Sequence, residues 1–514
     1  MAHSYDMSPA ERGFTTLAVI LAMLMQILDQ TIANVALPHM QTSLGANRET
    51  ITWVLTSYIV ASAIAIPITG WLAEQVGRKR LFIWSVTIFT IASMLCAVAQ
   101  NLGTMVAFRV IQGIAGAFLV PLAQSVMFDI NPPEKHARAM AMFGAGVMIG
   151  PILGPVLGGY LTDNFNWRWV FLINLPIGII AGAMMLRFLP ATPVSRKRFD
   201  LLGFFLIALA LGGLQMMLDR GETMDWFESW EIWVECGLAI SGLWMFVVHM
   251  MTARDPIFDL NMLKDRNFAT GMLFMAVTGV MLLAGLALLP PMLQNLFGYS
   301  VLQSGFLTAP RGVGTLLSMI VVGRLVGKFD ARLLILIGIG LMAWSLHLMS
   351  GFSLQMDRGP IVTSGIIQGF ALGFLFVPLN TLAFGTLDPK FRTTAASLLN
   401  LSRNVGGSIG ISVVTVLLAH NLQTSHSDLA SHITQYSLPP ISPAILQGAP
   451  PITDTVLMMA DAEVNRQALM IAYLDDFWLM MVISLLAIPL LLLLKKGRKR
   501  GDDDDDGPPP AHMD

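Results

Sequence analysis

Fourteen separate apolar segments constrain the fold of this chain more than any other feature of its sequence. A helix needs about 20 mostly apolar residues to cross the hydrocarbon core of a membrane. Segments of this kind recur along the chain, at residues 14–38, 52–74, 81–100, 104–128, 139–161, 170–189, 201–218, 231–251, 268–292, 304–326, 333–352, 360–384, 394–419 and 474–494. The sequence predicts an all-α polytopic membrane protein with 14 transmembrane helices, and the even number of crossings places both termini on one side.

The charge content supports a membrane protein and excludes several functions. Only 12% of the residues are charged, about half the share of a soluble domain. The net charge of −2 favours no nucleic-acid partner. Cys96 and Cys236 both lie in apolar segments, so a disulfide or a metal site is not expected. We find no phosphate-binding loop and no Ser–His–Asp pattern, and we therefore expect no cofactor, no enzyme activity, and an ion gradient as the energy source.

Basic residues set the orientation. Most of the 31 Lys and Arg residues fall in the loops on the side of the N-terminus or in the run "KKGRKR" near the end of the chain. Loops rich in Lys and Arg stay in the cytoplasm. Both termini are therefore expected there, as a tail over residues 1–13 and a second tail over 495–514.

An internal repeat divides the chain. The stretch "VIQGIAGAFLVPL" (110–122) recurs as "IIQGFALGFLFVPL" (366–379) with one extra residue, and "GWLAEQVGRKRL" (70–81) has a weaker echo in "GRLVGKFDARLL" (323–334). Both offsets are eight spans, which fits two parallel six-helix bundles with two helices inserted between them. We expect a first bundle over 14–189, a linker with two extra helices over 190–252, and a second bundle over 253–494.

Asp29 and Arg109 are the buried charges of the first bundle. Asp29 lies nine residues before Pro38 and Arg109 six residues after Gly103, roughly 13 Å and 9 Å below the same membrane face at 1.5 Å per residue. Unpaired ions at such a depth are costly, so we expect a pair or a wet cavity. A motion that changed their separation would change the proton affinity of Asp29. The alternative is a static ion pair that fixes helix packing.

Other polar residues lie inside the spans as candidates for a substrate cavity or for coupling. Gln26, Thr31 and Asn34 flank Asp29 at helical spacings, although hydrogen bonding between helices would also explain them. Arg311 either faces a cavity or extends toward the outer interface, whereas Arg403 lies too deep to do so easily. The remaining candidates are Gln112, Gln368 and Asn404.

Five motifs together resemble the fourteen-helix drug:proton antiporter branch of the major facilitator superfamily. They are "LDQTIANVALP" (28–38), "GWLAEQVGRKRL" (70–81), "RVIQGIAGA" (109–117), "GPILGPVLGG" (150–159) and "WRWVFLINLPIG" (167–178). Glu74 stands where the family usually has Asp. The resemblance implies an inner-membrane secondary transporter that exports hydrophobic or amphiphilic drugs in exchange for protons. Proton-linked export of a physiological amphiphile, such as a fatty acid or a bile acid, is the alternative, and a membrane-embedded enzyme is disfavoured.

The resemblance also implies roles for two of these motifs. The loop motif implies a cytoplasmic gate held by charge pairs, although its basic residues also serve as topology signals; the residues are Gly70, Glu74, Gly77, Arg78, Lys79 and Arg80. Small residues four apart let helices approach closely, and prolines bend a helix. The antiporter motif is therefore expected to shape the seam between the halves through Gly150, Pro151, Gly154, Pro155, Gly158 and Gly159.

One long outer segment, residues 420–473, is large enough for a dedicated surface. Its Pro-rich part is not expected to be regular, and the stretch that begins at Asp454 has helical periodicity. The resemblance implies the pump of a tripartite efflux system, with a periplasmic adaptor and, through it, an outer-membrane channel as partners. An apolar face with Leu457, Met458, Leu469 and Met470 would suit docking, and a loop folded back on the rim is the alternative.

Overall fold

The computed structural model describes residues 7–47, 50–195, 198–433 and 452–494. Its long helices follow the apolar segments, and 14 of them among the described residues are long and apolar enough to cross a membrane. The α-helices are α1 (Pro9–Ser43), α2 (Trp53–Ala65), α3 (Thr69–Val76), α4 (Arg78–Ala97), α5 (Leu102–Gly116), α6 (Leu119–Asp129), α7 (His136–Asn164), α8 (Trp169–Leu172), α9 (Asn174–Phe188), α10 (Leu201–Arg220), α11 (Trp230–Thr252), α12 (Leu260–Lys264), α13 (Arg266–Asn295), α14 (Val301–Leu325), α15 (Ala331–Ser350), α16 (Arg358–Gly385), α17 (Arg392–Ser431) and α18 (Ile452–Leu486). The predicted all-α class with fourteen spans is confirmed.

Spans 2 and 4 are each broken into two helices by a proline. Span 2 changes to a 3-10 turn at Ile66–Ile68, which contains Pro67, before α3 begins. Span 4 is interrupted between α5 and α6, where the ring of Pro121 opposes the carbonyl of Ala117 four residues earlier. Both breaks lie inside the membrane-crossing segments, at Thr50–Val76 and Leu102–Asp129.

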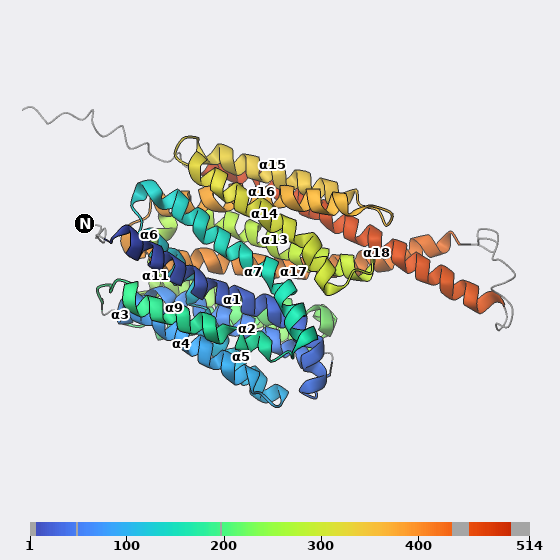
Figure 1. The fold of residues 1–514 in the computed structure, drawn as a ribbon, viewed down its shortest axis with the longest axis horizontal. Coiled ribbons are helices and arrows are strands. Elements are labelled where there is room, and N and C mark those ends of the chain that lie inside the picture. The colour runs from blue at the N-terminus through green and yellow to red at the C-terminus, as the bar shows by residue number, and fades with distance from the viewer. Residues whose placement is uncertain (1–6, 48–49, 196–197, 434–451, 495–514) are drawn as a thin grey trace, which may run out of the picture.

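The long helices pack side by side (Figure 1). Helix α7 of the first half packs against α1 on one side and against α14 of the second half on the other. Helix α10 packs against α11, α2 and α17, and Gln215 of α10 accepts a hydrogen bond from Ser408 of α17 at 3.0 Å. The extra pair of helices is therefore tied to both halves through α10.

Helices α17 and α18 extend beyond the rest of the bundle as an antiparallel pair (Figure 1). The helical periodicity predicted from Asp454 onward is confirmed, because α18 begins at Ile452. Helix α17 also continues to Ser431, into the segment predicted as an outer loop. The Pro-rich part between residues 434 and 451 lies outside the described residues. His426 and Asp461, 3.0 Å apart, link the two extended helices.

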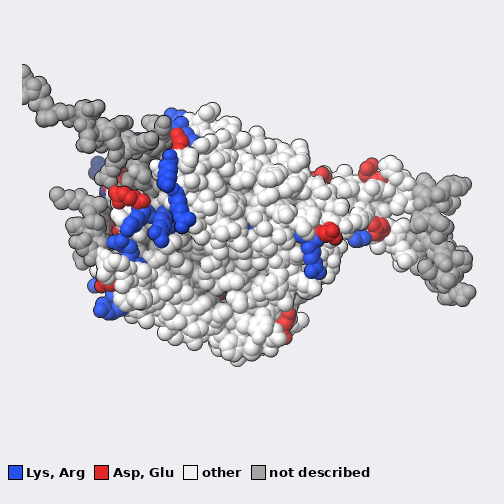
Figure 2. Space-filling view, turned by 45° about the horizontal axis from the view of Figure 1, so that its top comes forward, with Lys and Arg blue, Asp and Glu red and all other residues white. Residues whose placement is uncertain are grey.

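Lys and Arg side chains gather at the end of the bundle from which the chain starts (Figure 2). We call this the basic end. It includes the first turn of α4, with Arg78 and the exposed Arg80, and the start of α7, with the exposed Arg138. The extended pair of α17 and α18 projects from the opposite end. The charge asymmetry predicted from the sequence is therefore also an asymmetry of the folded molecule.

Candidate functional site

Asp29 of α1 and Arg109 of α5 form an ion pair inside the first half. The Arg109 Nη1 and the Asp29 Oδ2 are 2.6 Å apart, and both side chains are completely buried. Arg109 also donates from Nε to the carbonyl oxygen of Val54 at 2.9 Å. Its guanidinium lies over the Tyr58 ring, 4.3 Å from the ring centroid. The ion pair between Asp29 and Arg109, which their similar depths in the membrane predicted, is therefore present.

Neutral polar side chains complete the coordination of the Asp29 carboxylate. Gln112 donates from Nε2 to Oδ1 at 2.8 Å, and Asn174 of α9 donates to the same oxygen at 3.0 Å. Asn174 also donates to Ser93 of α4 at 2.9 Å. We call this set, with Arg109, the Asp29 cluster. Because several kcal/mol are lost when each buried ion leaves water, these bonds decide whether the charged pair is tolerated.

Sequence reasoning missed Asn174 and Ser93. Asn174 lies in the quoted motif "WRWVFLINLPIG", where a single polar residue in an apolar run was the available signal. Ser93 could not be singled out in this way, because serine occurs in many of the membrane-spanning segments. Asn174 reaches Asp29 only because α9 packs against α1, and Ser93 reaches Asn174 only because α4 packs against α9.

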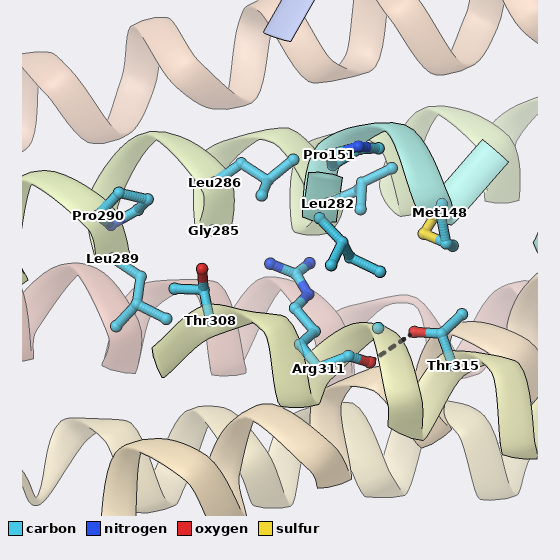
Figure 3. A pocket seen from close by; sticks show the side chains of 12 residues that line it. Met148, Pro151, Leu282, Gly285, Leu286, Leu289, Pro290, Thr308, Arg311 and Thr315 are labelled. Carbon is cyan, nitrogen blue, oxygen red and sulfur yellow. Dashed lines mark hydrogen bonds between the residues drawn. The ribbon is translucent and has the colours of Figure 1, made fainter. Parts of the chain in front are cut away.

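A second buried arginine, Arg311 of α14, lines a cavity between the two halves (Figure 3). The cavity measures about 30 Å³. Arg311 is 7% exposed, and among the described residues its Nη2 has no hydrogen-bond partner. The lining residues come from α7, α13 and α14 and are Met148, Pro151, Ile152, Leu282, Gly285, Leu286, Leu289, Pro290, Thr308, Arg311, Gly312 and Thr315.

The guanidinium of Arg311 points inward, toward Gly285 of α13 (Figure 3). A Cβ atom placed on Gly285 would lie 3.6 Å from Nη1 of Arg311 and 3.6 Å from Nε2 of Gln368 on α16. The Gln368 Nε2 is also buried without a partner among the described residues. The sequence left open whether Arg311 faces a cavity or extends toward the outer interface. The structure shows that it faces the cavity.

The remaining polar candidates belong neither to the Asp29 cluster nor to the cavity at Arg311. The Thr31 hydroxyl donates to the Ile27 and Leu28 carbonyls of its own helix and lies 3.4 Å from the Gly150 carbonyl oxygen, so Thr31 serves the contact between α1 and α7. Gln26 is buried, whereas Asn34 is exposed. Arg403 packs its backbone against Gly279 of α13. Neither Arg403 nor the half-buried Asn404 is among the cavity-lining residues.

At the basic end, side chains of the two halves bond directly to each other. Asp129, the last residue of α6, pairs with Arg78 of α4 and with Arg392 of α17, the latter at 2.9 Å. Deeper along the same contact, Gln124 bonds to Asn380 and accepts from Asn400 at 2.8 Å. This set of contacts closes the basic end, and Asp129 is the acid that sequence reasoning missed.

The residues predicted for the gate lie next to this contact. Gly70 is packed so closely on Thr394 of α17 that a Cβ would collide with the threonine hydroxyl. Gly77 has a φ of +88°, which L side chains rarely adopt, and it caps the turn into α4. Lys79 donates to the Leu186 carbonyl at 3.0 Å, and the Glu74 carbonyl accepts from the Ser195 backbone at 2.9 Å.

The two faces of the antiporter motif on α7 have different neighbours. Gly150 and Gly154 face α1, where a Cβ would collide with Ile27 and Thr31, and a Cβ on Gly158 would lie 3.2 Å from Ile32. These glycines therefore pack inside the first half and do not face the seam, which corrects the sequence-based expectation. The opposite face of α7 packs against α14 and forms the seam between the two halves.

Bulky residues of α7 meet glycines of α14 at the seam. Ile152 occupies the space where a Cβ of Gly312 would stand, and Val156 lies 3.1 Å from the Cβ position of Gly305. Pro151 lines the cavity, and the Pro155 Cβ is 3.9 Å from the Gly305 position. The position of Gly159 is most closely approached by Val301 of α14, at 3.9 Å.

A family profile described as Major Facilitator Superfamily matches residues 19–411. The chain belongs to the major facilitator superfamily. The multidrug export protein EmrB of Escherichia coli is 36% identical over 496 residues, which cover 95% of this chain and 96% of that protein. The fatty acid resistance protein FarB of Neisseria gonorrhoeae is 37% identical over 431 residues, which cover 83% of this chain and 85% of that protein. The resemblance seen in the motifs is confirmed.

Solved structures share the fold at much lower identity. The proton:xylose symporter XylE has a TM-score of 0.61 at 13% identity and covers 94% of this chain and 95% of its own. The human organic anion transporter MFSD10 has a TM-score of 0.60 at 15% identity and covers 94% of this chain and 100% of its own. Family and fold together identify a multi-pass membrane transporter rather than an enzyme.

Proposed function

We propose that the chain exports hydrophobic or amphiphilic compounds across the inner membrane in exchange for protons. The observation that carries the proposal is the Asp29 cluster, a carboxylate fully buried among membrane-spanning helices and held by Arg109. Relatives named for multidrug export and for fatty acid resistance support the direction and the range of substrates.

The coupling would proceed through separation of the ion pair. In the structure the pair is closed, with Arg109 2.6 Å from the Asp29 carboxylate. A rearrangement of α1 against α5 that weakened the pair would leave the carboxylate in a low-dielectric site, where it takes up a proton. Return of Arg109 would release it. The basic end would face the cytoplasm, in agreement with the charge rule for loops.

The experiment is substrate efflux in inverted membrane vesicles that contain the full chain. We expect dye accumulation when a proton gradient is imposed, loss of accumulation when a protonophore is added, and proton release when substrate is added to the purified protein in liposomes. Accumulation that persisted without a gradient would overturn proton exchange.

We further propose that the extended pair of α17 and α18 docks a periplasmic adaptor, which leads to an outer-membrane channel. Leu457 and Met458 of α18 are 54% and 73% exposed, whereas Met470 is buried and Leu469 half-buried among the chain's own helices. The docking face is therefore narrower than the sequence suggested. Replacing Leu457 and Met458 with Ser should weaken crosslinking to an adaptor while vesicle transport continues; unchanged crosslinking would place the adaptor elsewhere.

A physiological amphiphile, such as a fatty acid, is a second candidate substrate. The observation that favours it is the buried guanidinium of Arg311 in a cavity lined mainly by apolar side chains. An anionic head group with an apolar tail would match such a lining.

A further inference from the structure

We propose that Arg311 and Gln368 form a receptor for the carboxylate of the exported compound, so that amphiphilic monocarboxylates are the preferred substrates. This proposal rests on the export function above and names its substrate class. It concerns how the substrate is bound, and it is independent of how the proton is carried.

The free donors converge on one point. Nη1 of Arg311 and Nε2 of Gln368 each lie 3.6 Å from the Cβ position of Gly285, so both approach the same space above α13. Nη2 of Arg311 and Nε2 of Gln368 are buried without partners among the described residues. The two threonines that line the cavity are already satisfied, because Thr308 and Thr315 donate to carbonyls of their own helix. The free donors at this point therefore belong to Arg311 and Gln368, as an anion requires.

Comparison of the two halves through the internal repeat indicates that the anion bound by Arg311 and Gln368 is a carboxylate. Gln112 and Gln368 occupy the same position in the repeated stretches "VIQG" and "IIQG". In the first half, Gln112 and Arg109 both donate to the carboxylate of Asp29. In the second half the glutamine is kept and an arginine is again beside it, supplied by α14 instead of α16. The corresponding carboxylate is absent.

The helix that would supply that carboxylate carries Gly285 instead. Asp29 belongs to the first span and Gly285 to the ninth, and this offset of eight spans is the offset of the repeat. Glycine leaves open the space that a side chain would fill between α13, Arg311 and Gln368. A carboxylate brought by a ligand would take the place that Asp29 takes in the first half.

Within the part of the chain that the structure describes, the helices that surround Arg311 offer no acidic side chain to pair with it. Throughout their described lengths α13, α14 and α16 contain no Asp or Glu. The acid of α7, Asp163, lies eleven residues beyond Ile152, about 16 Å along the helix. The balancing charge must therefore come from a molecule that enters the cavity, and an anionic substrate is favoured over a neutral one.

The size and the position of the cavity fit a head group with a tail. A volume of about 30 Å³ accommodates about two water molecules, which is comparable to a carboxylate group. The surrounding Leu, Ile, Met and Pro side chains are apolar, and α7 and α14 belong to different halves. Separation of the halves along this seam would extend the apolar part of the site and admit the tail.

Binding of dodecanoate and of dodecanol to the purified full chain in lipid nanodiscs tests the proposal. We expect the wild type to bind dodecanoate more tightly than dodecanol. R311Q keeps a polar side chain of similar reach without the charge, and it should weaken dodecanoate binding about 10–100-fold, the loss expected for a charge-assisted hydrogen bond. Dodecanol binding should be unchanged, which also shows that the variant is folded.

Two further variants test the second donor of the receptor and the specificity of the effect of Arg311. Q368L should reduce dodecanoate affinity by a smaller factor than R311Q. R403Q removes another membrane-embedded arginine that does not line the cavity, and it should leave the preference for the carboxylate intact. Equal loss of both ligands in R311Q, or an unchanged preference, would overturn the receptor. Because these measurements need no gradient, their failure would leave proton-linked export standing.

Discussion

The two halves of the chain hold buried arginines in opposite states of charge balance. In the first half Arg109 is paired with Asp29, and Gln112 and Asn174 satisfy the same carboxylate. In the second half Arg311 has an unpartnered nitrogen within the described residues and a glycine where a carboxylate would fit. The repeat therefore preserved the pattern of donors but not the acid, which leaves one half closed on itself and the other open to a ligand.

Asp29→Asn should have the largest effect, because it removes the carboxylate that pairs with Arg109. Asn keeps the size of the side chain and an oxygen for the bond from Gln112, so the protein should insert normally. It cannot take up a proton, so proton-driven efflux should fall to background. Substrate-evoked proton release from the purified variant is the measurement, and release at the wild-type rate would refute the coupling role of Asp29.

Gly285→Asp makes the converse change, because it places a carboxylate beside Arg311 in the second half. The new carboxylate would reach Arg311 and occupy the proposed receptor, so dodecanoate affinity should fall on the order of tenfold or more. Thermal stability should rise, since an uncompensated buried charge becomes paired.

Gly285→Ala is the matched control for that change. Its Cβ would meet Arg311 and Gln368 at 3.6 Å, an ordinary contact. Dodecanoate affinity should therefore stay close to that of the wild type. If alanine reduced the affinity as much as aspartate, the space above Gly285, and not the missing charge, would explain the result.

Comparison of Gly312→Leu with Gly154→Leu tests which face of α7 forms the seam between the halves and which face packs inside the first half. Leu at 312 would push on Ile152 across the seam, whereas Leu at 154 would push on Thr31 within the first half. Overpacking typically costs about 1–3 kcal/mol. We expect the first variant to lose transport while it retains thermal stability, and the second to lose stability. Melting temperature and vesicle transport, measured together, distinguish the two, and identical behaviour would contradict the assignment of the two faces of α7.

Arg392→Gln should have the smallest effect. Arg392 belongs to the second half and Arg78 to the first, and both pair with Asp129. Loss of one partly buried pair is expected to change the ratio of closed to open conformations by about 1 kcal/mol, or roughly fivefold. Labelling of a cysteine placed at Gln124 should increase. Arg78→Gln, which removes the pair inside one half, should change this labelling less.

Much of the fold could be predicted because each span is a local property of the sequence. The apolar runs set the fourteen helices, and Pro67 and Pro121 break two of them through the lost backbone bonds. The pairing of Asp29 with Arg109 was also accessible, because depth in a membrane helix follows from residue number alone. The repeat of Gln112 and Gln368 was visible too, although its meaning was not.

The tertiary structure alone decided which way each side chain faces. Successive residues of a helix are rotated by about 100°, and only packing fixes the rotation of one helix against the next. This rotation turns Gly154 toward α1 and Ile152 toward α14, brings Asn174 to Asp29, and directs Arg311 to Gly285 instead of the outer interface. The sequence alone placed Asp29, Arg109 and Arg311 inside membrane spans, whereas the packing of the helices decided which of them are paired.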